Sequence, residues 1–184
     1  MTEKQYSGIL IYSQLTHENY IHTVFFELVD KAKELSKKLG GVEVNAVLFT
    51  PKGLIDGFKE AFCNMGLNNV YYFEDDRFKN YSTIYYSKLI VDLIGVLKPE
   101  IFLVGATNQG RDLAPRISSE LGTGLTADCT GLDINEKGQL AATRPTFGGQ
   151  LMATILCKTF PQMATVRPGV MQKLPKEAGR KAEV

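Results

Sequence analysis

The stretch "IFLVGATNQGRDLAPRISSELG" (residues 101–122) contains the pattern that decides the fold. Residues 101–106 are a short, continuous apolar run, which is typical of a strand buried on both faces of a parallel sheet. A polar turn with glycine at both ends follows, and it leads into a segment predicted to be helical. The stretch therefore predicts a buried strand, a polar turn and a helix, in that order.

The same alternation of strand and helix precedes this stretch along the chain. Strands are predicted at residues 8–13, 42–49, 69–73 and 101–106, and helices at 21–39, 54–66 and 81–99, the last closed by Pro99. Strands that alternate with helices at this spacing indicate βαβ units. The predicted fold class is α/β, with a mainly parallel, doubly wound sheet as the middle of three layers.

The pattern changes after Gly124. Short apolar runs are joined there by turn signals, the clearest being "NEKG" (135–138) and "FGG" (147–149). We expect additional C-terminal antiparallel strands, added to the sheet or folded against one end of it. The expected division is an α/β domain at residues 1–172 and an interdomain linker or disordered tail at 173–184, where apolar residues are few.

Composition excludes several classes of function. The net charge of this 184-residue chain is +1, which is not the basic footprint of a nucleic-acid-binding protein. No apolar run approaches the ~20 residues of a membrane span. The three cysteines are widely separated, which favours reduced thiols in the cytoplasm over a disulfide scaffold or a metal site. With two histidines and no triad or paired-carboxylate pattern, no catalytic residue is predicted.

The polar turn is a candidate nucleotide site. Doubly wound sheets bind ligands at the carboxyl ends of strands, where the strand order reverses. If the first and fourth predicted strands flank that point, the turn lies in a crevice beside the end of the first strand. The N-terminus of a helix there would offer N–H groups and a positive dipole end to a phosphate. The candidate cofactor-binding residues are Ser13, Thr107, Asn108, Gln109, Gly110 and Arg111.

Pro115 favours another interpretation of this turn. Because proline is tolerated in the first turn of a helix, we expect the helix to begin near Arg111 or Asp112, with Asp112 as its N-cap. An N-cap carboxylate would occupy N–H groups that a phosphate needs. The turn also lacks the Lys-Ser/Thr pair of a P-loop. Two interpretations therefore stay open, a nucleotide site and a structural or docking loop.

Two Arg-Pro pairs mark the C-terminal region, at Arg144 and Arg167. The residue before a proline is extended, which would hold each guanidinium outward near a strand end. On adjacent strands the two arginines would form a cluster that faces a partner or an anionic cofactor. The alternative is that they are ordinary arginines at the rim of the molecule.

The chain contains four motifs that are informative in combination: "NQGRDLAPR" (108–116), "GLTADC" (124–129), "RPTFGG" (144–149) and "PQMATVRPG" (161–169). With them the chain, from about residue 8 to 171, resembles the N-terminal domain of the electron-transfer flavoprotein alpha subunit. The resemblance implies an adenine-nucleotide alpha-hydrolase-like fold and a heterodimer with the beta subunit. Such a complex carries electrons from dehydrogenases, such as acyl-CoA dehydrogenases, to a quinone reductase or another acceptor. The chain would then be an electron-carrier subunit and not an enzyme.

The resemblance also implies a cofactor and site residues. FAD is expected in the full complex. Most of its contacts are expected to come from a C-terminal domain that we expect this chain to lack. The matching motif positions put Thr107–Arg111 in the crevice loop, and they put a second set on the face toward the flavin domain or the beta subunit: Arg144, Thr146, Gly148, Gly149, Arg167 and Pro168. The alternative function is a stand-alone domain of the same fold that binds AMP or ATP.

Overall fold

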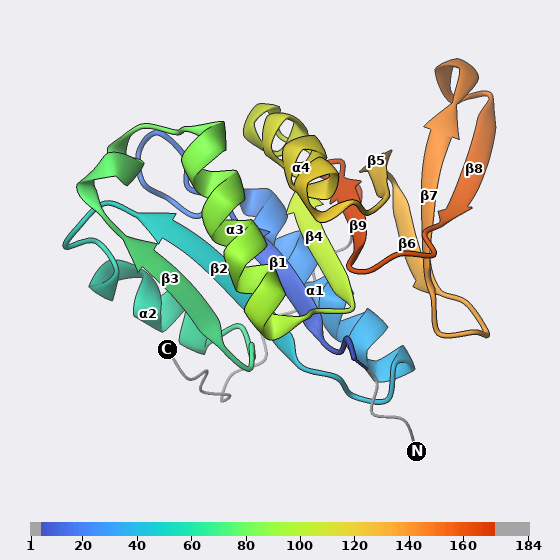
Figure 1. Ribbon diagram of the computed structural model, residues 1–184, viewed down its shortest axis with the longest axis horizontal. Coiled ribbons are helices and arrows are strands. Elements are labelled where there is room, and N and C mark those ends of the chain that lie inside the picture. The colour runs from blue at the N-terminus through green and yellow to red at the C-terminus, as the bar shows by residue number, and fades with distance from the viewer. Residues whose placement is uncertain (1–4, 172–184) are drawn as a thin grey trace.

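The computed structural model describes residues 5–171 and contains a six-stranded parallel sheet with helices on both faces, beside a three-stranded antiparallel sheet (Figure 1). The strand order is β3-β2-β1-β4-β9-β5 in the main sheet and β6-β7-β8 in the small one. The strands are β1 (Ile9–Ser13), β2 (Val44–Thr50), β3 (Val70–Glu74), β4 (Ile101–Gly105), β5 (Leu125–Cys129), β6 (Gly131–Ile134), β7 (Leu140–Thr146), β8 (Leu151–Leu156) and β9 (Gln162–Val166). The helices are α1 (Thr23–Lys38), α2 (Asp56–Cys63), α3 (Thr83–Leu97) and α4 (Asn108–Leu121), with short 3-10 turns η1 (Asp76–Lys79) and η2 (Phe147–Gly149).

Each face of the main sheet has its own apolar core. Successive side chains of a strand point to opposite faces. Ile9 and Ile11 of β1 therefore join the core under α1, while Leu10 and Tyr12 join the core under α3 and α4. Every residue of β1, β4 and β9 is buried, as expected for central strands covered on both sides. Figure 1 shows α3 and α4 in front of the sheet and α1 and α2 behind it. The predicted three-layer, doubly wound α/β class is confirmed.

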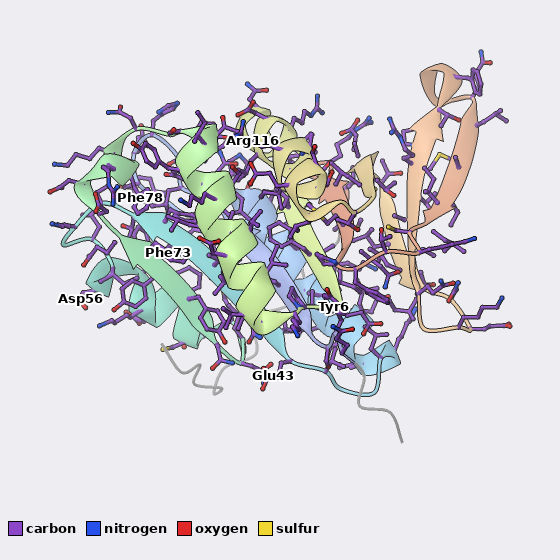
Figure 2. The ribbon with its side chains drawn as sticks, viewed as in Figure 1. Tyr6, Glu43, Asp56, Phe73, Phe78 and Arg116 are labelled. Carbon is purple, nitrogen blue, oxygen red and sulfur yellow. The ribbon has the colours of Figure 1, made fainter. Side chains whose placement is uncertain are left out.

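Four aromatic side chains pack together beside β3, at the edge of the core that α3 and α4 cover. Phe49 of β2 packs against Phe73 and Phe78, each with ring centroids 5.1 Å apart, and against Tyr86 of α3 at 4.5 Å. Figure 2 labels Phe73 and Phe78 on this side of the molecule. Aromatic pairs in this distance range add to the stabilisation from apolar burial. The group holds η1 and α3 against the sheet.

The predicted elements up to β4 are confirmed in type and order, with boundaries that differ by a few residues. The two turn predictions are also confirmed, because residues 135–138 join β6 to β7 and η2 joins β7 to β8. The N-cap of α1 is His22, whose side chain accepts a hydrogen bond from the Val24 N–H. Local signals were therefore sufficient to predict the elements of the fold as far as β4.

The expected run of antiparallel strands after Gly124 is confirmed for β6, β7 and β8 but is wrong for β5 and β9. Both belong to the main sheet, where β9 lies between β4 and β5 and runs parallel to each. The small antiparallel sheet is the connection between them. All of β9 is buried, so a central position removes more of its surface from water than an edge position would. Turn signals show where a strand ends but not which strand it pairs with.

The small sheet packs on the α1 side of the molecule. Leu132, Leu140 and Ala142 belong to the core that α1 covers. An ion pair of 2.5 Å between Lys38 and Asp133 also links α1 to β6. The β7–β8 hairpin extends away from the main sheet (Figure 1). Its outer strand is mostly exposed.

The expected linker or tail at residues 173–184 lies outside the described residues, so the expected domain division stays a prediction. Within residues 5–171, every helix is too short or too polar to cross a membrane.

Candidate functional site

The carboxyl ends of β1, β4, β9 and β5 lie along one edge of the main sheet, because these strands are parallel. β1 and β4 are neighbours, which meets the condition set for the predicted crevice. The chain order reverses between them: β2 and β3 follow on one side, and β9 and β5 on the other. Doubly wound sheets bind ligands at this edge. It is therefore the candidate functional site.

The turn after β4 is closed by its own side chains. The N-cap of α4 is Thr107, whose hydroxyl oxygen accepts a hydrogen bond from the Gly110 N–H at 3.0 Å. That hydroxyl also donates to Gln14 Oε1 at 2.5 Å. Gln109 Nε2 donates to the Tyr12 hydroxyl at 2.8 Å. The structure thus brings the turn and the end of β1 together, as predicted, and bonds them to one another.

The prediction that Asp112 is the N-cap of this helix is wrong. Asp112 lies inside α4, and its carboxylate accepts hydrogen bonds from the Thr83 hydroxyl and, at 2.7 Å, from the Tyr81 hydroxyl. These bonds lower the pKa of Asp112 from its ordinary value. Asp112 therefore links α4 to the start of α3 and does not reach the N–H groups of the turn.

The error came from Pro115. We expected this proline in the first turn of the helix, but it lies well inside α4, which begins at Asn108. A proline there removes one backbone hydrogen bond. Burial of apolar side chains on both sides of the proline offsets that loss: Leu113, Ala114 and Ile117.

The geometry leaves less room for a nucleotide than the sequence suggested. Thr107, and not Asp112, already takes the N–H of Gly110. Ser13 is only 1% exposed, so its hydroxyl does not lie on an open surface. Asn108 and Arg111 are exposed. The nucleotide site remains a prediction, whereas the observed turn satisfies much of its own hydrogen bonding.

We expect Thr107→Ala to lower the free energy of unfolding by about 1 kcal/mol, which is the usual cost of losing an N-cap side chain. Urea denaturation at neutral pH measures this loss. Ser82→Ala is the matched control, because Ser82 is the N-cap of α3 but makes no side-chain cap bond. The control should change stability by less than about 0.5 kcal/mol. Equal losses in the two variants would contradict the capping role of Thr107.

A second group of side chains surrounds Asp128 at the end of β5. Arg111 Nη2 donates to Asp128 Oδ1 at 3.0 Å. Arg167 donates to both carboxylate oxygens, from Nε at 3.4 Å and from Nη2 at 2.6 Å. The charge of Arg144 also acts on this carboxyl. We call these four residues the Asp128 cluster. It unites arginines that the sequence analysis assigned to two separate sets.

Sequence reasoning missed Asp128, for which the only signal was its place in the motif "GLTADC". Its φ is 60°, which few residues other than glycine adopt, and the pairing with β9 is irregular between Thr126 and Cys129. The Asp128 N–H donates to Thr165 Oγ1 at 2.8 Å and so holds this irregular backbone in place. Such irregularities redirect a side chain from the regular alternation of a strand.

The hydrogen bonds from Arg167 hold the pKa of Asp128 below its ordinary value. A carboxyl with a lowered pKa stabilises the fold while it is ionised. The contribution of Asp128 is therefore present at neutral pH and is lost as the pH falls through the lowered pKa.

The other predicted residues lie in the hairpin and just after β9. Thr146 ends β7, and Gly148 and Gly149 form the η2 turn with φ of 67° and 91°, a conformation that glycine adopts at little cost. Pro168 follows Arg167 and is partly exposed. Phe147 at this turn is 78% exposed. The predicted face is thus a surface and not part of the core.

Comparison with known proteins now assigns the family. The profile of the family described as "Electron transfer flavoprotein domain" matches residues 9–184. This chain belongs to the electron transfer flavoprotein domain family. The resemblance that the four motifs indicated is confirmed.

Relatives within the electron transfer flavoprotein family agree with this assignment. The chain is 45% identical to the electron transfer flavoprotein subunit alpha of Clostridium acetobutylicum, over 95% of this chain and 52% of that protein. It is 44% identical to the subunit alpha of Thermoanaerobacterium thermosaccharolyticum, over 97% and 53%. It is 43% identical to protein FixB of Bradyrhizobium diazoefficiens, over 91% and 46%. The chain spans about half the length of the curated relatives it matches.

A flavin is the cofactor that the name of the electron transfer flavoprotein family implies. The hollow beside the Asp128 cluster has a volume of about 160 Å³ and is lined by Arg111, Pro115, Leu125, Ala127, Asp128 and Thr165. Pockets that hold a whole cofactor usually measure about 300–1,000 Å³. The hollow therefore does not fit FAD. Within residues 5–171, no three His, Cys, Asp or Glu side chains gather in a way that could hold a metal ion.

Proposed function

We propose that this chain is the N-terminal part of the alpha subunit of a heterodimeric electron transfer flavoprotein and scaffolds its assembly. In this proposal FAD is held mainly by parts of the complex outside this chain. The complex carries electrons in the cytoplasm from dehydrogenases, such as acyl-CoA dehydrogenases, to a quinone reductase or another acceptor. The flavin supplies the redox chemistry, while the protein binds and orients it. This chain is then a carrier subunit without a substrate-converting site of its own.

The observation that carries the proposal is the apolar surface of the β7–β8 hairpin. Its large apolar side chains are exposed, from 40% for Ile155 to 78% for Phe147. Exposed apolar groups gathered on one element mark interaction sites. We call this set the hairpin surface: Phe147, Leu151, Met152, Ile155 and Leu156.

The outer edge of the hairpin suits a protein partner. β8 is an edge strand of the small sheet, and its sequence "LMATIL" contains no charged residue and no proline. Edge strands usually carry such residues, because their unpaired N–H and C=O groups otherwise pair with other chains. A strand of a partner would extend the sheet at β8. Because successive side chains of a strand point to opposite faces, the partner's own side chains would cover the hairpin surface on both faces of the small sheet. We assign this place to the beta subunit, because the relatives are named as one subunit of an assembly.

The second set of predicted residues fits the same proposal. Arg144, Thr146, Gly148 and Gly149 belong to β7 and the η2 turn, and Arg167 and Pro168 follow β9. Their proposed role remains the face toward the flavin domain or the beta subunit.

Met152→Lys is expected to weaken binding of the beta subunit at least tenfold, because binding would then bury a charge in an apolar interface. The measurement is titration of this chain with the beta subunit from the same genome, followed by analytical ultracentrifugation. Val96→Lys is the matched control, since Val96 is 79% exposed but lies on α3. It should bind like the unmodified chain.

Two results would contradict the proposal. Unchanged binding in Met152→Lys would show that the hairpin surface does not dock the beta subunit. A mixture in which the unmodified chain only pairs with itself would assign β8 to a second copy instead.

A further inference from the structure

The Asp128 cluster contains more positive charge than its carboxylate neutralises. Arg111 and Arg167 bring two guanidinium groups to one aspartate, and the charge of Arg144 also acts on that carboxyl. Arg111 donates from Nε to the Ala106 carbonyl at 3.0 Å and from Nη2 to Asp128. Arg167 uses Nε and Nη2 on Asp128. Within residues 5–171 the Nη1 groups of Arg111 and Arg167 are thus left as available donors.

Arg144 provides a second, independent observation. Its Nε is buried and has no hydrogen-bond partner among the described residues. A buried donor on a cation is costly to leave without an acceptor. An acceptor that these residues do not supply would satisfy it.

The cluster is open to a ligand from solvent. The side chains of Arg111 and Arg167 are 57% and 44% exposed. The hollow of about 160 Å³ is lined by Arg111 and Asp128 of the cluster, with an apolar wall formed by Pro115, Leu125 and Ala127. A hollow of this size takes one chemical group and not a whole cofactor.

We infer that the Asp128 cluster is an oxyanion site that binds a phosphate group, either free or carried by a nucleotide. Guanidinium groups bind phosphate through pairs of charge-assisted hydrogen bonds. The available donors of Arg111 and Arg167 hold the phosphate, Asp128 fixes both arginines in position, and Arg144 adds a third charge. This site shares Arg111 with the turn capped by Thr107, but it does not use the backbone N–H groups of that turn. It goes beyond the proposed scaffolding function and does not depend on it.

Binding of inorganic pyrophosphate and of ADP to the 184-residue chain tests the inference. We expect saturable binding by NMR titration, with the largest shifts at the amides of Asp128 and Arg167. Arg167→Gln should weaken binding about tenfold or more. Added NaCl should also weaken it, because salt screens exposed charges. Tighter binding of ADP than of pyrophosphate identifies a nucleotide as the source, and equal binding identifies the phosphate group alone.

Three further variants separate the site from its alternatives. Arg77→Gln is the matched control, because Arg77 is an exposed arginine paired with one aspartate, Asp75. It should bind both probes like the unmodified chain, and so should Asn108→Ala in the turn. Asp128→Asn should bind them more weakly, because Arg111 and Arg167 lose the carboxylate that fixes them in position.

The inference is overturned by any of three results. The first is an absence of saturable binding of both probes. The second is binding that is unchanged in Arg167→Gln, which would make the cluster a purely structural group of ion pairs. The third is binding that Asn108→Ala removes, which would place the phosphate in the turn.

Discussion

Replacing Gly110 by alanine is expected to lower the free energy of unfolding by at least about 3 kcal/mol, or to prevent folding. A Cβ atom at this position would lie 1.9 Å from the Gly105 carbonyl oxygen and 3.0 Å from Val104 Cγ1. The nearer of these atoms is a backbone oxygen, which cannot avoid the clash by a change of rotamer as a side chain can. The turn between β4 and α4 would have to open, and the hydrogen bond from the Gly110 N–H to Thr107 would be lost with it.

Gly95→Ala is the matched control for Gly110→Ala. Gly95 lies in α3, it is exposed, and a Cβ there would meet no atom within 4 Å. Alanine has a higher helix propensity than glycine, so this variant should be more stable than the unmodified chain by about 0.5–1 kcal/mol. Urea denaturation of both variants measures the difference. Gly110→Ala as stable as Gly95→Ala would show that the turn is not closely packed against β4.

The strands up to β4 could be predicted because a strand buried on both faces has a continuous apolar sequence, which can be recognised in each strand by itself. β1 and β4 are entirely buried and read as continuous apolar runs. The position of β9 within the sheet cannot be recognised from its own sequence in this way. Its pairing with β4 and β5 depends on the whole connection through the small sheet. Local patterns therefore indicate that β9 is a strand, but they do not indicate its neighbours.

The candidate site shows the same limit. The turn residues could be proposed as a site because they follow β4 directly, and the structure places β4 beside β1. The Asp128 cluster forms only because β9 lies beside β5, which brings Arg167 to an aspartate 39 residues earlier in the chain. All three of its arginines were candidates already, but nothing in the sequence indicated their common partner. The N-cap was mistaken for a related reason, since packing of α4 outweighed the local preference of Pro115.

Glu27→Gln is expected to lower the free energy of unfolding by about 2 kcal/mol. Glu27 lies on α1 and is only 3% exposed. Its carboxylate accepts hydrogen bonds from the Gly169 N–H, at 2.9 and 3.1 Å to its two oxygens, and from the Met171 N–H at 3.3 Å. Glutamine keeps the shape but removes the charge, and it turns an NH₂ group toward backbone donors. Both changes weaken bonds that water cannot replace at a buried position.

Glu34→Gln on the same helix is the control for Glu27→Gln. The Glu34 side chain is 46% exposed, and it pairs with Lys31. Exposed pairs contribute little, so the control should lose less than about 1 kcal/mol.

Hydrogen exchange of the Gly169 and Met171 amides then locates the effect of Glu27→Gln. These amides should lose protection in Glu27→Gln and keep it in Glu34→Gln, because both amides donate hydrogen bonds to the Glu27 carboxylate. Unchanged protection in Glu27→Gln would mean that this segment is held by Met171 in the core and by its own turn. The carboxylate would then not position the segment that carries Arg167 into the Asp128 cluster.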